Sequence, residues 1–121
     1  MQNQKNENDF LNLLKSSKNI NGTFHCKRNE TLMDLDIKDI KFMDCEIYGG
    51  DFCSSVFSNC IFERVLFRES QLIGIVFSKC KFVECRFSNI EPDFSLNNCE
   101  IKSLTVTHET IKAASRPWSV K

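Results

Sequence analysis

The feature of this 121-residue sequence that most constrains its fold is a repeat of five residues. Every fifth position from residue 32 to residue 87 is Leu, Ile or Phe. A period of five matches neither the α-helix nor the β-strand, so a chain that keeps it has to bend once in every unit. Regular bends favour a solenoid of stacked coils. The repeat centres are Leu32, Ile37, Phe42, Ile47, Phe52, Phe57, Phe62, Phe67, Leu72, Phe77, Phe82 and Phe87.

A second column supports this interpretation. Apart from Glu30, the residues two places before the centres are small or apolar. Residues two apart on an extended chain point to the same side, so each unit is expected to place two side chains inward. The residue two places after each centre is then available for the bend, and several of these residues suit a positive φ: Asp34, Asp39, Asp44, Gly49, Asn59, Gly74 and Asn89. Four bends close a loop of twenty residues, and successive loops would stack at the strand spacing of about 4.8 Å.

Residues 60–64, 80–84 and 85–89 read Cys-Ile-Phe-Glu-Arg, Cys-Lys-Phe-Val-Glu and Cys-Arg-Phe-Ser-Asn. These units resemble those of the pentapeptide repeat proteins, which carry a small residue, a polar residue and then Leu or Phe. The resemblance covers residues 30–90, and more loosely 94–112. It implies an all-β fold: a right-handed quadrilateral β-helix, that is, a solenoid, here of about four to five coils. The sequence departs from the family pattern before the centres, where Val56, Ile61, Leu66 and Val76 replace the usual Asp or Asn.

The chain is expected to form one domain with capped ends. Residues 1–29 would be an N-terminal cap, with Asp9 as N-cap of a short helix over 9–17 and Phe10, Leu13 and Leu14 on its apolar face. Residues 19–29 of this cap fit no pattern. Residues 30–90 form the regular array. In residues 91–112 Pro92 takes the next expected centre, and the pattern resumes one residue early with Leu96, Ile101, Val106 and Ile111. Residues 113–121 would be a tail or second cap, in which Trp118 covers an end or a partner subunit.

The inward positions leave little room for catalysis, because they hold Phe, Leu, Ile and Cys. Five of the seven cysteines lie at inward positions, so they are expected to be reduced core residues rather than disulfides or zinc ligands. His25 and His108 lie outside the array and are expected to be ordinary surface or cap residues. We expect a protein that is not an enzyme and has no cofactor and no metal. It is also expected to be cytoplasmic and without a membrane span, since it has no long apolar run and no signal-peptide pattern.

The outer faces are therefore the place to look for function. Stacking by twenty is expected to join Cys53, Val56, Ile73 and Val76 in one contiguous apolar patch, while Ile61 and Leu66 continue the apolar outward set on the next two faces. We interpret this candidate partner surface as a contact for another protein or for a second copy in a homodimer. The alternative is that these residues favour strand structure and are shielded by the caps.

Charge gives a second indication. The net charge is zero, but residues 30–51 hold seven acids against two lysines. The resemblance admits a DNA-mimic regulator of a type II topoisomerase such as DNA gyrase, with the acidic first coil as its contact: Asp34, Asp36, Asp39, Asp44, Glu46 and Asp51. Residues 52–90 hold three acids against five bases, but this mildly basic end has no dense Lys/Arg stripe, so direct nucleic-acid binding is not expected. Three hypotheses remain: a non-catalytic protein-binding module with a partner of unknown identity, a DNA mimic, and a purely structural self-assembling element.

Overall fold

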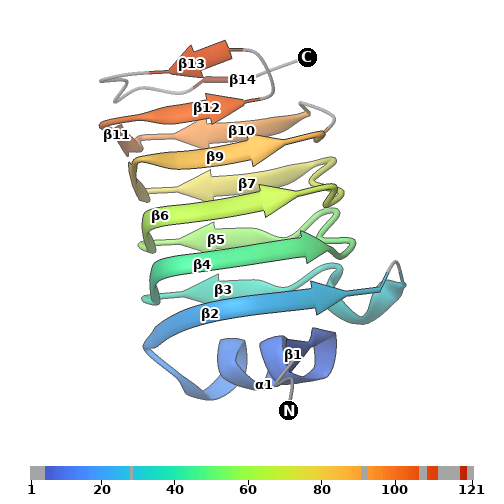
Figure 1. Ribbon diagram of the computed structural model, residues 1–121. Helices are drawn as coiled ribbons and strands as arrows, with labels where there is room; N and C mark the ends of the chain where they lie inside the picture. The colour runs from blue at the N-terminus through green and yellow to red at the C-terminus, as the bar shows by residue number, and fades with distance from the viewer. Residues whose placement is uncertain (1–4, 28, 91–92, 107–108, 112–117, 120–121) are drawn as a thin grey trace.

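The structure, a computed structural model, describes residues 5–27, 29–90, 93–106, 109–111 and 118–119. One short helix precedes a series of short strands (Figure 1). The elements are β1 (Lys5–Asn6), α1 (Glu7–Ser16), β2 (Asn19–Cys26), the 3₁₀ turn η1 (Glu30–Leu32), β3 (Asp36–Lys38), β4 (Lys41–Gly49), β5 (Val56–Ser58), β6 (Ile61–Arg68), β7 (Ile75–Ser78), β8 (Lys81–Val83), β9 (Cys85–Ser88), β10 (Phe94–Asn97), β11 (Glu100–Ile101), β12 (Leu104–Val106), β13 (Glu109–Ile111) and β14 (Trp118–Ser119).

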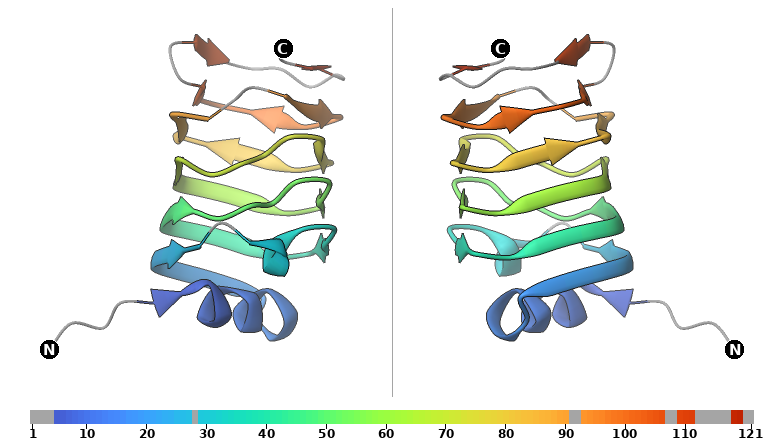
Figure 2. Two further views of the ribbon diagram at one scale, coloured as in Figure 1. Left: turned by 90° about the vertical axis from the view of Figure 1, so that its right-hand side faces the viewer. Right: turned by 90° about the vertical axis from the view of Figure 1, so that its left-hand side faces the viewer.

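Most strands pair in parallel within two sheets. The larger sheet follows the order β1-β2-β4-β6-β9-β12-β13, with β8 and β11 beside this path, and the smaller sheet follows β14-β10-β7-β5-β3. In the regular array, partners on adjacent strands are twenty residues apart, as in Phe42↔Phe62 and Phe57↔Phe77. Successive coils therefore stack along one axis, with the N-terminal helix at one end (Figure 1 and Figure 2). This arrangement of parallel sheets is compatible with a β-solenoid.

The bends occur at the predicted positions. Every fifth residue from 34 to 89 has a positive φ, which includes all seven of the Gly, Asn and Asp residues expected there. Five turn residues that the pattern did not single out adopt the same conformation: Ser54, Arg64, Glu69, Lys79 and Glu84. For these side chains the left-handed region is less favourable than for Gly, Asn or Asp. The repeat therefore fixes this backbone conformation even where the residue type does not favour it.

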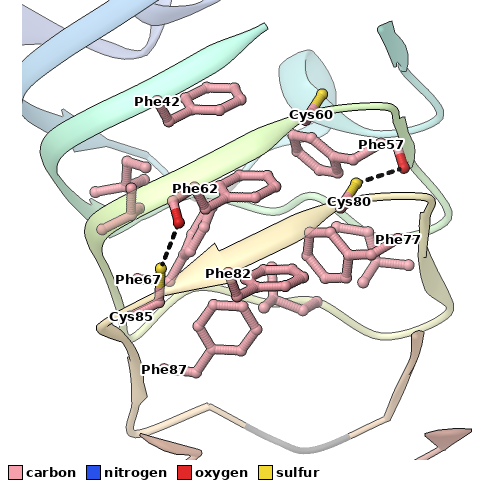
Figure 3. Packing of buried hydrophobic residues seen from close by; sticks show 14 of the residues in the cluster. Phe42, Phe57, Cys60, Phe62, Phe67, Phe77, Cys80, Phe82, Cys85 and Phe87 are labelled. Atoms are coloured by element: carbon pink, nitrogen blue, oxygen red, sulfur yellow. Dashed lines mark hydrogen bonds between the residues drawn. The ribbon is translucent and has the colours of Figure 1, made fainter. Parts of the chain in front are cut away.

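The interior is a column of aromatic side chains. All twelve repeat centres are at most 3% exposed. Phe62 stacks on Phe42 with ring centroids 4.8 Å apart and on Phe82 at 4.9 Å, with nearly parallel planes (Figure 3). Phe57 and Phe77 form a second stacked pair at 5.2 Å. Each coil thus buries its own aromatic rings against those of the coils above and below.

The N-terminal end differs in detail from the prediction. Asn6, not Asp9, is the N-cap of α1: Asn6 Oδ1 accepts from the backbone N–H of Asp9, and Asp9 Oδ2 accepts from that of Asn6. This reciprocal pair is a capping box, so Asp9 stands three residues inside the helix. Phe10 is fully buried, with its ring 4.7 Å from that of Phe24. Leu14 is buried as well, and Leu13 is half-buried against the core, so this helix covers the first coil.

Residues 19–26, which fit no sequence pattern, form strand β2. Ile20 pairs with Phe42 and Phe24 pairs with Ile47, with a register shift between Ile20 and Gly22. Because β2 spans the same two sides of the coil with one residue fewer than β4, its apolar residues are four apart rather than five. The larger sheet therefore begins before residue 30, with β1 and β2.

The C-terminal end keeps the predicted shift of one residue. Partners here are nineteen apart, as in Phe94↔Ile75 and Leu104↔Cys85. Pro92 itself lies outside the described residues. The structure differs from the prediction at Ile111. This residue does not continue the parallel array, because β13 pairs antiparallel with β12 and Ile111 lies opposite Leu104. Trp118 pairs antiparallel with Leu96, so the β14 backbone lies along the last strand of the smaller sheet.

Candidate functional site

The four residues predicted to form an apolar patch lie together at one corner of the solenoid. Val56 and Val76 are direct partners on β5 and β7. The turn before these strands places Cys53 and Ile73 one coil apart, since Ser54 N–H donates to the carbonyl oxygen of Ile73 at 3.1 Å. Ile73 is 37% exposed, whereas Cys53, Val56 and Val76 are half-buried. We call these four residues, Cys53, Val56, Ile73 and Val76, the apolar corner.

Polar side chains border the apolar corner. On one side run Asp51 and Gln71, which form a parallel bridge. On the other side run Ser58 and Ser78, which are partners on β5 and β7. An apolar centre with a polar rim is the usual anatomy of a protein–protein contact. The apolar corner thus has the same arrangement of apolar and polar side chains, over a smaller area.

Ile61 and Leu66 are not part of this corner. Ile61 is 39% exposed, but its partners on the neighbouring strands are Lys41 and Lys81. Leu66 is half-buried and lies between Glu46 and Arg86. Each of the two is a single apolar side chain between charged ones, which is normal for a protein surface.

The predicted acidic contact forms a ring rather than a stripe. Its members follow one coil around the solenoid instead of running along the axis, and two of them are paired with bases. Asp44 accepts two hydrogen bonds from the Arg64 guanidinium, at 2.6 and 3.3 Å, and Asp36 lies 3.6 Å from Lys38 Nζ. The hydrogen bond from Arg64 lowers the pKa of the Asp44 carboxyl. The acidic ring comprises Asp34, Asp36, Asp39, Asp44 and Glu46, which are exposed, and Asp51, which is half-buried.

The inward cysteines have a structural role. All seven cysteines are free thiols. The Sγ of Cys80 donates to the carbonyl of Phe57 at 3.3 Å, and that of Cys85 donates to the carbonyl of Phe62 at 3.2 Å (Figure 3). Ser55 makes the same contact with Leu32 at 3.0 Å. Burial raises the pKa of Cys45 to about 12 and that of Cys85 to about 11, so these thiols are poor nucleophiles.

The sequence pattern did not predict one surface feature, an aromatic stack between β2 and β4. His25 on β2 stacks on Tyr48 of β4 at 5.1 Å, and the Tyr48 hydroxyl donates to Glu46. The two rings are twenty-three residues apart because partners on β2 and β4 are twenty-two residues apart before the register shift and twenty-three after it, so stacking by twenty does not bring them together. Beside them a shallow hollow of about 420 Å³ is lined by charged residues that include Asp44, Arg64 and Arg86. Asp44 and Arg64 pair with each other there.

No group of three or more His, Cys, Asp or Glu side chains in the described part of the chain is placed to hold a metal ion. Within the same residues, no helix has the length and apolar character needed to cross a membrane. Comparison with known proteins found no matching family model and no matching curated protein. The candidate site is the apolar corner, on the evidence of its pairing across β5 and β7 and of the turn before them.

Proposed function

We propose that this chain is a non-catalytic protein-binding module, and that the apolar corner is its contact surface. The observation that carries the proposal is the placement of Ile73 and Val76 beside Cys53 and Val56 on the outside of two adjacent coils, with polar residues on both sides. Covering apolar surface is favourable by about 25 cal/mol per Å². A partner that covers this corner gains that energy without burying a charged side chain of the corner itself.

The fold that we propose for the module is the right-handed quadrilateral β-helix of the pentapeptide repeat proteins, with about four to five coils. The support is the positive φ at every fifth residue and the register of twenty between partners. In such a scaffold the core uses the regular residues, so specificity has to come from outward side chains. We propose that the module acts in the cytoplasm on another protein.

The alternative, a DNA mimic acting on a type II topoisomerase, receives less support from the geometry. A duplex presents one charge per roughly 1.7 Å along its axis. The acidic ring runs across the solenoid axis, and Arg64 and Lys38 partly neutralise it. If the protein is such a mimic, gyrase supercoiling changes when it is added. We expect no change at concentrations up to roughly 100 times those of the enzyme.

The experiment that tests the protein-binding proposal compares two matched substitutions. Ile73→Asp lies in the apolar corner, and Ile61→Asp lies on a different face at nearly the same exposure, 37% against 39%. Each variant is immobilised, and proteins from the native host are captured and quantified. We expect a partner retained by the wild type and by Ile61→Asp, and captured about tenfold less by Ile73→Asp. Equal capture by all three proteins would contradict the proposal.

A further inference from the structure

We infer that the edge of strand β3 binds an extended peptide segment of a partner protein, which adds to the smaller sheet as one more strand. This surface is separate from the apolar corner, so the inference goes beyond the proposed function. β3 is the last strand of the smaller sheet, and within the described residues no strand pairs with it on the side away from β5. An edge of this kind presents free backbone N–H and C=O groups.

The ladder with β5 shows which backbone groups of β3 are free. Val56 N–H donates to the carbonyl oxygen of Leu35 at 2.8 Å, so Leu35 directs its backbone groups toward β5. In a parallel ladder, successive residues of a strand direct these groups alternately to one neighbour and to the other. Ile37 therefore faces β5 as well. The N–H and C=O groups of Asp36 and Lys38 point the other way, where a further strand can bond them.

The edge is open because a helix replaces a strand on the preceding coil. β5 comes before β6 and β3 comes before β4, but the segment before β2 is α1. The stack itself continues at the next corner, where Lys41 N–H donates to the carbonyl oxygen of Lys18 at 2.8 Å. The missing neighbour of β3 is therefore a local gap beside a continuous sheet.

The fold closes three other strands of the stack with short added strands. β1 pairs with β2, β13 pairs with β12, and β14 pairs with β10. Each added strand has two or three residues, and β3 itself has three. A short extended segment is thus the kind of neighbour that this stack accepts. Addition of a peptide strand to a sheet edge is also a common mode of peptide recognition.

A groove beside β3 provides space for such a segment. It has a volume of about 490 Å³ and lies between α1, which contributes Leu11, Leu14 and Lys15, and residues 35–38. Side chains alternate along a strand, so the residue of an added strand opposite Ile37 points inward, as the buried Ile37 does. The two leucines of the helix favour an apolar side chain at this position.

The charges of the groove favour an acidic residue beside the apolar one. Asp36 and Lys38 are exposed and pair with each other at 3.6 Å. Lys15 is exposed as well, and it forms no ion pair with any residue that the structure describes. The lining is therefore net positive. Because opposite charges on neighbouring strands attract, the occupant is expected to place an acid opposite Lys38 and a neutral residue opposite Asp36.

Two tetrapeptides with acetylated and amidated ends serve as probes: Val-Thr-Ile-Glu and its reverse, Glu-Ile-Thr-Val. They place Ile opposite Ile37 and Glu opposite Lys38 in a parallel and in an antiparallel strand, respectively. Each is titrated into the isotope-labelled protein and followed by NMR. The better peptide is expected to bind with a dissociation constant of roughly 1 mM and to shift the amide signals of Asp36 and Lys38 most. No shift with either peptide at about 10 mM would overturn the inference.

A proline at the edge tests the pairing itself. Lys38→Pro removes the N–H group that points away from β5, which an edge strand tolerates, and Lys38→Thr is the matched control that loses the same charge but keeps the N–H group. We expect Lys38→Thr to bind within about threefold of the wild type, and Lys38→Pro to bind at least about tenfold more weakly than Lys38→Thr. Equal binding by the two variants would overturn strand addition. Ile73→Asp is expected to bind the peptide like the wild type, so this result is independent of the proposed function.

Hydrogen exchange of the wild type keeps the inference testable if Lys38→Pro does not fold. In the free protein, the amides of Asp36 and Lys38 are expected to exchange at least about tenfold faster than that of Val56, which is bonded to Leu35. Amides of Asp36 and Lys38 as slow as that of Val56 would mean that the edge is already covered, and would overturn the inference.

Discussion

The Sγ atom of Cys80 lies 3.3 Å from the carbonyl oxygen of Phe57, which belongs to the preceding coil. Cys99 makes the same contact with the carbonyl of Phe77, also at 3.3 Å. These contacts connect successive coils through side chains that are at most 3% exposed. The thiols are therefore hydrogen-bond donors inside the core as well as small apolar groups.

Replacement of Cys80 tests this role. Cys80→Ser keeps a donor of similar size, as the buried Ser55 and Ser70 do at equivalent positions, and is expected to cost less than about 1 kcal/mol. Cys80→Ala removes the donor and leaves a small void, and is expected to cost about 1–2 kcal/mol. Urea unfolding measures both values. A serine variant less stable than the alanine variant would show that the contact with Phe57 contributes nothing.

The turn residues allow a stabilising substitution. Glu84 is exposed and has a φ of 53°, a conformation that Asn adopts more readily than Glu. Glu84→Asn is expected to raise the free energy of unfolding by about 0.5–1 kcal/mol, and Glu84→Val to lower it by about 1–2 kcal/mol because of its branched side chain. The midpoints of urea unfolding at a constant slope give the comparison. Equal midpoints for the two variants would mean that the residue type at this turn is unimportant.

Alkaline pH is expected to destabilise the fold through the buried thiols. The pKa of Cys45 is raised from 9.0 to about 12 because burial disfavours the thiolate. The folded chain therefore keeps a proton that the unfolded chain releases, so this contribution is complete below pH 9.0 and is lost as the pH rises toward 12.

The urea midpoint should accordingly fall as the pH rises above 9.0. Cys45→Val isolates the contribution of this thiol, since Val65 occupies the same position on the next coil. The variant is expected to lose stability less steeply over the same pH range. Parallel curves for the variant and the wild type would exclude a contribution from Cys45.

The N-terminal helix is expected to be required for the stability of the first coil. The Phe10 ring is fully buried, 6.4 Å from that of Phe42 and 6.1 Å from that of Phe52. Phe10→Ala should cost about 3–5 kcal/mol, the usual range for a buried Phe, while the half-buried Leu11 on the same helix gives a control, with Leu11→Ala expected to cost about 1 kcal/mol. Thermal unfolding of the two variants checks the difference. Similar losses for both would mean that the helix does not cover the core.

The five-residue period of the sequence predicted the core and the turns of the regular array. It predicted the twelve buried centres and the bends, because a repeat with one obligatory turn leaves one backbone solution per unit. It also predicted that Val56 and Val76 lie side by side, since their separation equals one coil. Wherever partners are twenty residues apart, the sequence also predicts which outward side chains lie next to each other on successive coils.

The parts that the period did not predict are those where this spacing changes. Strand β2 has one residue fewer than β4 between its two apolar positions, so Ile20 and Phe24 look irregular in sequence although both are buried. The His25–Tyr48 stack was missed because partners on β2 and β4 are twenty-two or twenty-three residues apart rather than twenty. The capping box at Asn6 did have a signal, an Asn three residues before Asp9. The antiparallel return at Ile111 had none, because nothing in the spacing reveals the direction of a chain after the repeat ends.

Photocrosslinking tests the central claim, that the apolar corner binds protein, most directly. A benzophenone amino acid is placed at position 73 or, as the control of matched exposure, at position 61, and each variant is irradiated in cells of the native host. The account predicts a crosslinked product of higher mass from position 73 and little or none from position 61. Its mass distinguishes a second copy of the 14.0 kDa chain from a different protein. No product from position 73, or equal products from both positions, would contradict the account.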